Sequence, residues 1–220
     1  MTSHVPAYTR RAAPSRGRLR QALTLAAWIA LLALALAGCT GAPAPSASTA
    51  PSPTVSPTPS YKQADDKGKA QNVPVPVIPA EAKAHTKEGL QAFMKHWVGL
   101  ASYAYETGDT NPLFDVTGAG CKTCNDLKVT LEATYGRGGW VSGGTLQFAS
   151  AESPMIRNQY GQIAGVVQFK QDEIAFRNED GTIRTKFDAD LTPAAKLFLV
   201  VERDGGWELG DVGNAPKATP

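Results

Sequence analysis

The sequence has few of the residues that most often carry catalysis or bind metals. It contains three cysteines and three histidines in 220 residues, and only His85 and His96 lie beyond Cys39. A structural zinc site needs four ligands, and no second cysteine pair or nearby histidine accompanies Cys121 and Cys124. The glycines match neither a phosphate-binding loop nor a dinucleotide fingerprint. We therefore expect no catalytic residue, no metal and no cofactor.

The segment before Cys39, residues 1–38, has no acidic residue and holds five arginines. Without this segment the formal net charge falls from +2 to about −3, because 17 basic and 20 acidic side chains remain. A mildly acidic chain with dispersed charges lacks the basic patch that nucleic-acid binding requires. We therefore expect no nucleic-acid partner.

The chain also lacks an apolar run long enough for a stable membrane span. Its main run, Ala22–Leu36, has 15 residues and is interrupted only by Thr24. A membrane-spanning helix needs about 20 apolar residues. A basic segment precedes the run and small residues follow it, which is typical of a signal peptide. We assign residues 1–38 to a signal peptide.

The residues at this boundary, Leu36, Ala37, Gly38 and Cys39, resemble the bacterial lipobox. The resemblance implies that a signal peptidase recognises the first three, cuts before Cys39, and that the Cys39 thiol carries a diacylglycerol. Two acyl chains anchor a protein stably, because each buried methylene contributes about 0.8 kcal/mol. We therefore expect a lipid-anchored protein on the extracytoplasmic face of the cell membrane, with membrane lipid as a partner through Cys39.

Large apolar residues are scarce between Cys39 and Pro79, where nine of the 16 prolines fall. A segment of this composition cannot bury enough apolar surface to offset its chain entropy. Proline also favours extended backbone there. We predict a disordered linker over residues 39–79, a folded domain over residues 80–213 and a disordered tail over residues 214–220.

Apolar periodicity predicts two helices at the start of the domain. Thr86 can cap a helix of about 20 residues, whose apolar side chains recur every three or four positions as far as Gly108. A long loop and a second helix over residues 125–135 follow.

The rest of the domain has the composition of β-strands separated by glycine-rich turns. Gly143 and Gly144 are expected to form a bulge or bend inside the first strand. We predict an α+β domain in which two N-terminal helices pack on a curved antiparallel sheet of about four to five strands. The predicted strands cover residues 140–151, 161–177, 182–191, 196–203 and 207–212.

The order of these elements and the closing hairpin over residues 198–209 (FLVVERDGGWEL) resemble the nuclear transport factor 2-like superfamily. Residues 75–79 (VPVIP), Trp97 and the motif Cys121-Lys-Thr-Cys124 resemble a family of actinobacterial lipoproteins of unknown function. The resemblance implies a cone-shaped sheet and a homodimer formed through its open face. Because that family has no known activity, the resemblance assigns no catalytic residue to this chain.

Some enzymes of this superfamily use an acid and a tyrosine in the mouth of the cone to move protons. The candidate pocket residues here are Trp97, Tyr103, Tyr105 and Asp115. The same residues also suit a plainer interpretation, in which the aromatic side chains belong to the core and the acid is solvated.

Cys121 and Cys124 allow two interpretations. An oxidising compartment favours a structural disulfide, which adds at most about 2 kcal/mol when it closes so short a loop. The alternative is a redox role, because a thiol at a helix N-terminus has a lowered pKa. The strand and the βαβ arrangement typical of such redox motifs are not evident in the sequence.

The sequence therefore favours a non-catalytic binding module for a small apolar ligand or a cell-envelope partner. The alternative is an enzyme of the superfamily, with proton-transfer or hydrolytic activity, or a thiol–disulfide redox protein that uses Cys121 and Cys124.

Overall fold

The structure is a computed structural model and describes residues 59–216. Every described residue belongs to one compact unit, Val55–Pro220. This unit has a hydrophobic core of its own, which is what a domain needs to fold alone. Within residues 59–216, no helix combines the length and the apolar character that crossing a membrane requires.

Three α-helices and one short 3-10 helix form the first half of the domain. The longest, α1 (Lys87–Thr107), begins where the sequence predicts, because the Thr86 hydroxyl accepts a hydrogen bond from the Gly89 amide at 3.1 Å. It ends at Gly108, which has a positive φ of 76°. The other helices are η1 (Ala80–Lys83), α2 (Asn111–Phe114) and α3 (Lys122–Tyr135).

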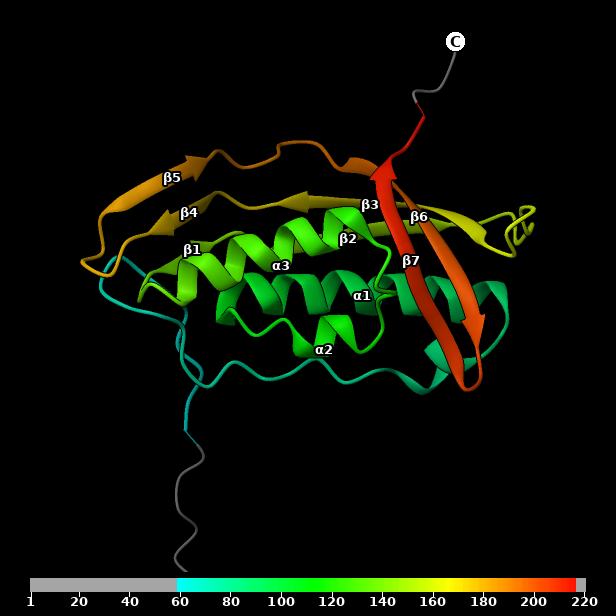
Figure 1. The fold of residues 1–220 in the computed structure, drawn as a ribbon, viewed down its shortest axis with the longest axis horizontal. Helices are drawn as coiled ribbons and strands as arrows, with labels where there is room; N and C mark the ends of the chain where they lie inside the picture. The colour runs from blue at the N-terminus through cyan, green and yellow to red at the C-terminus, as the bar shows by residue number, and fades with distance from the viewer. Residues whose placement is uncertain (1–58, 217–220) are drawn as a thin grey trace, which may run out of the picture. The chain divides into compact units, whose positions relative to one another are not determined.

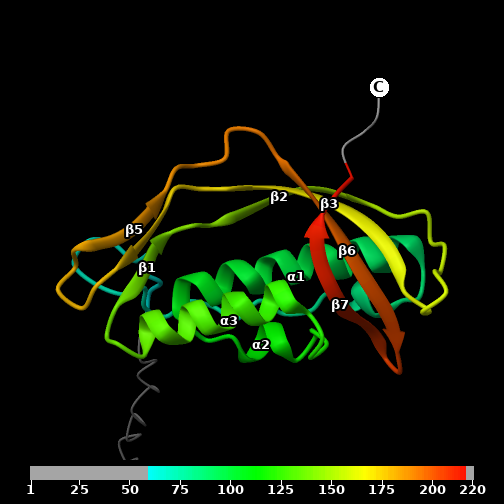
Figure 2. The ribbon, with the colours of Figure 1, turned by 45° about the horizontal axis from the view of Figure 1, so that its top comes forward.

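Residues 59–216 contain seven strands, which form two antiparallel sheets. The strands are β1 (Trp140–Gly143), β2 (Leu146–Glu152), β3 (Ile163–Gln171), β4 (Ile174–Arg177), β5 (Ile183–Phe187), β6 (Ala194–Arg203) and β7 (Gly206–Asn214). One sheet has the order β1-β4-β5 and the other the order β2-β3-β6-β7. The sheets arch over α1 and α3, while α2 lies against α1 on the side away from them (Figures 1 and 2).

The prediction of two helices on a single sheet of four to five strands is wrong. The long loop contains a further helix, α2, where the sequence analysis expected only loop. Two of the predicted strands are each broken in two, so that β1 is separated from β2 and β3 from β4. The structure therefore has three α-helices and seven strands in two sheets, which also removes the support for the predicted nuclear transport factor 2-like arrangement.

The break between β1 and β2 has a clear physical cause. Gly143 and Gly144 have φ values of 72° and 77°, which only glycine adopts readily. A Cβ atom on Gly143 would lie 2.1 Å from the carbonyl oxygen of Glu173, in the turn between β3 and β4. The β1–β2 and β3–β4 segments therefore bend at the same place. This bend separates the strands into two sheets that share a concave side.

The segment before η1 is packed on the domain, although the sequence analysis assigned it to the linker. The Trp140 indole donates a hydrogen bond to the carbonyl oxygen of Asp65 at 2.9 Å, and the Tyr61 hydroxyl donates to the Glu106 carboxylate. Ile78 packs against the hydrophobic core. The ordered part of the chain thus includes residues 59–79, and main-chain carbonyls and scattered apolar side chains hold it in place.

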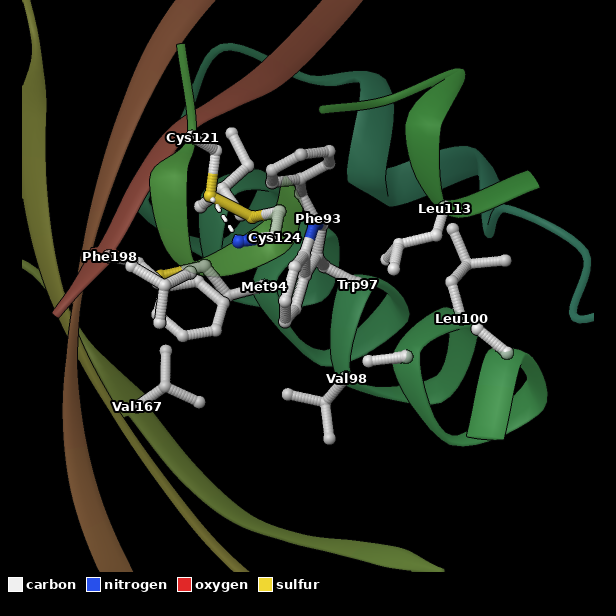
Figure 3. Close-up of a cluster of buried hydrophobic side chains, with 14 of the residues drawn as sticks. Phe93, Met94, Trp97, Val98, Leu100, Leu113, Cys121, Cys124, Val167 and Phe198 are labelled. Carbon is white, nitrogen blue, oxygen red and sulfur yellow. Dashed lines mark hydrogen bonds between the residues drawn. A yellow bond between two sulfur atoms is a disulfide. The ribbon is translucent and has the colours of Figure 1, made fainter. Parts of the chain in front are cut away.

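The core fills the space between α1 and the sheets. Phe93, Met94 and Phe198 are fully buried there, and the Trp97 and Phe198 rings meet edge to face at 5.1 Å between centroids. Cys121 and Cys124 are joined by a disulfide in the same core cluster and are 0% and 1% exposed (Figure 3). The bond ties the first turn of α3 to the residue that caps it.

The bend predicts a specific stability loss. Gly143→Ala should lower the free energy of unfolding by about 2 to 4 kcal/mol, because it adds backbone strain and a collision with the Glu173 carbonyl. The matched control is Gly161→Ala, whose φ is 76° but whose Cβ meets no atom within 4 Å. The control should lose only about 1 kcal/mol in urea unfolding. Equal losses for the two variants would contradict the role of the bend.

The disulfide predicts a second stability loss. Replacing both Cys121 and Cys124 by alanine should lower the free energy of unfolding by about 2 kcal/mol, since the unfolded chain regains the closed-loop entropy. Urea unfolding of the wild type in a strong reductant should show a similar loss. An unchanged unfolding midpoint in both measurements would show that the bond contributes nothing to stability.

Candidate functional site

A cavity of about 570 Å³ lies between α3 and the concave side of the sheets. Its size falls within the range of about 300–1,000 Å³ that is usual for small-molecule sites. Most of its inner lining is apolar or aromatic, and the polar side chains come mainly from α3 and from β6 and β7. The lining residues are Trp97, Ala101, Tyr105, Thr123, Cys124, Asp126, Leu127, Thr130, Leu146, Phe169, Gln171, Phe176, Lys196, Val212, Gly213 and Asn214.

Strand β3 shows how the core gives way to the cavity. Its inward-facing positions begin with Ile163 and Val167, which are 1% and 0% exposed. The next inward positions, Phe169 and Gln171, are only half-buried and line the cavity. The inner face of β3 is therefore fully covered near Val167 and only partly covered near Gln171.

Tyr105 lies on the helix wall of this cavity. It follows Trp97 and Ala101 at intervals of four residues on α1, so all three side chains face the same side. Burial raises the pKa of the Tyr105 phenol, and the nearby Gln171 amide partly offsets the effect. The phenol is therefore protonated at neutral pH and offers the cavity a hydrogen-bond donor, with no anionic charge.

The charged side chains of the lining are Asp126 and Lys196. Asp126 forms an ion pair with Lys122 one helical turn earlier, at 2.7 Å. The Lys196 amine donates a hydrogen bond to the Asn214 side-chain oxygen at 2.9 Å. Among the described residues, Lys196 takes part in no ion pair.

The structure brings two of the four candidate pocket residues together. Trp97 and Tyr105 both line the cavity, and the Trp97 indole is fixed by a 2.9 Å hydrogen bond to the Thr117 hydroxyl. Tyr103 is half-buried on another side of α1, and Asp115 is exposed at the end of α2. Neither of them lines the cavity, so it contains no pair formed by Tyr105 and Asp115.

A second cavity, of about 540 Å³, lies between the end of α3 and the β4–β5 turn. Charged residues of both signs line it, among them Arg137, Glu179, Asp180 and Arg184. It has no apolar floor comparable to that of the first cavity. We therefore take the cavity beneath α3 as the candidate site.

No group of three or more histidine, cysteine, aspartate or glutamate side chains in the described part of the chain is arranged to hold a metal. Cys39, Leu36, Ala37 and Gly38 lie outside the described residues, as do residues 40–58 of the predicted linker and the last four residues of the predicted tail.

Sequence reasoning missed most of the cavity lining, including Lys196. A usable signal was present, because Lys196, Phe198 and Val200 alternate along one strand and thus share a face. A lysine on the same face of a strand as two core residues is unusual. It indicates the position where the hydrophobic core ends. The sequence could not predict that α3 forms one wall of the cavity, because this depends on how the helix packs against the sheets.

Comparison with known proteins yields one match to a family and distant structural likenesses. No curated protein matches the chain at a significant level. The intermembrane space region of the chloroplast protein ARC6 superposes with a TM-score of 0.41 at 10% identity, covering 59% of this chain and 96% of that one. Aln2 from a Streptomyces species has a TM-score of 0.34 at 10% identity, covering 54% of this chain and 84% of its own. Neither likeness carries an argument about function.

The family match covers the whole ordered domain except its last three residues. The model of a family of unknown function, DUF6318, matches residues 59–213. This range begins at the first described residue and therefore includes the segment before η1 as well as the cavity lining up to Gly213. The chain belongs to the DUF6318 family.

Proposed function

We propose that this chain is an extracytoplasmic lipoprotein, anchored through Cys39, whose domain binds a small apolar ligand in the cavity beneath α3. The support for the anchor is the signal-peptide pattern of residues 1–38, the lipobox-like Leu36–Cys39 and the proline-rich stretch that follows. The resemblance to actinobacterial lipoproteins agrees with it. The domain would then act outside the membrane, within reach of envelope lipids and solutes.

The observation that carries the binding function is the partial exposure of large apolar side chains inside the cavity. Tyr105, Leu127, Leu146 and Phe169 line it, pack against the core, and remain only partly buried. A ligand that covers them gains about 25 cal/mol for each Å² of apolar surface removed from water. Polar groups near the mouth can orient such a ligand without covering the apolar floor.

The same lining argues against proton-transfer catalysis. Such a reaction needs an acid or base beside the reacting atom. The only carboxylate of the lining, Asp126, is exposed on α3 and paired with Lys122, so the lining holds no buried acid beside Tyr105. Binding is therefore the function that this arrangement supports best.

A thiol–disulfide redox function is also disfavoured. Exchange begins when a thiolate attacks one sulfur atom of the disulfide, so a sulfur must be reachable. Cys121 is 0% exposed and Cys124 is 1% exposed. The disulfide therefore suits a structural role.

Lipidation is tested by metabolic labelling with an alkyne fatty acid. The wild type should take up the label, and Cys39→Ser should not, since the serine hydroxyl cannot form the thioether. The control replaces Cys121 and Cys124 by serine, keeps Cys39, and should be labelled. Label that persists in Cys39→Ser would contradict the anchor.

Ligand binding is tested with N-phenyl-1-naphthylamine, an uncharged probe that becomes fluorescent in apolar surroundings. Leu127→Trp fills part of the cavity and should weaken binding by about tenfold or more. The matched control is Val129→Trp on the same helix, whose native side chain is 65% exposed and outside the cavity. It should bind like the wild type. Thermal unfolding shows whether both variants are folded, and equal affinity in all three proteins would contradict binding in this cavity.

A further inference from the structure

We infer that the ligand is an amphiphile with a single anionic head group, and that Lys196 binds this head. The inference rests on the proposed function, because it assigns a ligand class to the same cavity. The apolar lining receives the body of the ligand, and the lysine amine receives the charge.

The register of the sheet places Lys196 on the concave face. It lies opposite Val167 on β3 and opposite Asn214 on β7. Val167 is fully buried on the inner side of the sheet, and directly paired residues of antiparallel strands point to the same side. Lys196 is also two positions from Phe198, which is fully buried in the core. The lysine therefore continues a row of core side chains into the cavity.

The charge of Lys196 is not balanced by a neighbouring acid. Among the described residues its amine has one hydrogen-bond partner, the neutral Asn214 side chain at 2.9 Å, although an ammonium group carries three donors. The acid that shares the cavity, Asp126, is already paired with Lys122. A half-buried cation beside apolar surface favours an anionic ligand, because the interaction of opposite charges strengthens as water is displaced.

The arrangement selects an elongated ligand with two unlike ends. Tyr105, Leu146 and Phe169 provide an apolar floor, while Lys196 and Asn214 lie together on β6 and β7. A fully polar anion would leave the floor exposed to water. A neutral hydrocarbon would leave the lysine without a counter-charge. An aliphatic carboxylate satisfies both parts of the cavity.

The test uses the unit Val55–Pro220 and compares decanoate with 1-decanol, which have the same chain length and differ in head-group charge. Both are measured by displacement of N-phenyl-1-naphthylamine from the wild type, Lys196→Met and Lys170→Met. Lys170 lies on the same four-stranded sheet, at an outward position of β3 next to Phe169, and is outside the cavity.

The wild type should bind decanoate about five- to tenfold more tightly than 1-decanol, as expected for one charge-assisted contact that is partly exposed. Lys196→Met should abolish this preference, because decanoate then loses its charge-assisted contact while 1-decanol has none to lose. Lys170→Met should keep the preference.

Two results would overturn the inference, and they can be told apart. If the wild type binds decanoate and 1-decanol equally, or if Lys196→Met keeps the preference, the head-group assignment is wrong while the apolar cavity still binds ligands. If neither compound nor the probe binds the folded wild type, the proposed function fails and the inference fails with it.

Discussion

The bend at Gly143 and Gly144 is the constraint on which the rest of this structure depends. Without side chains at these two positions, the β1–β2 segment can follow the turn between β3 and β4 at a separation that no Cβ atom would permit. The paired strands therefore turn together, and their inner faces enclose α1 and α3 (Figure 2). The core around Phe198 fills part of this concave space, and the part next to α3 remains as a cavity.

The disulfide and the helix contacts stabilise the wall opposite the sheets. Cys121 and Cys124 hold the first turn of α3 within the core, and the Thr123 hydroxyl donates a hydrogen bond to the carbonyl oxygen of Val212 on β7 at 2.9 Å. The Tyr135 hydroxyl lies 2.8 Å from the carbonyl oxygen of Tyr105, which joins the far end of α3 to α1. The cavity is thus framed by elements that are fixed at both ends, which favours a largely pre-formed site.

Local sequence patterns predicted the local structure well and its assembly less well. The Thr86 cap and the Gly108 stop locate α1, because capping and periodicity depend on neighbouring residues. The glycine pair was recognised as a bend, but its effect depends on contact with Glu173, 30 residues away, which a single sequence does not reveal. The packing of residues 59–79 on the domain could not be predicted for the same reason. It depends on contacts between residues far apart in the sequence, such as the hydrogen bond from the Trp140 indole to the Asp65 carbonyl oxygen.

Binding of an anionic amphiphile in the cavity beneath α3 can be measured residue by residue. The most direct measurement is a titration of ¹⁵N-labelled Val55–Pro220 with decanoate, followed by amide chemical shifts. We expect saturable shift changes concentrated at residues around the cavity, including Tyr105, Leu127, Phe169 and Lys196. Unchanged spectra, or changes centred on Arg137 and Arg184 at the other cavity, would contradict it.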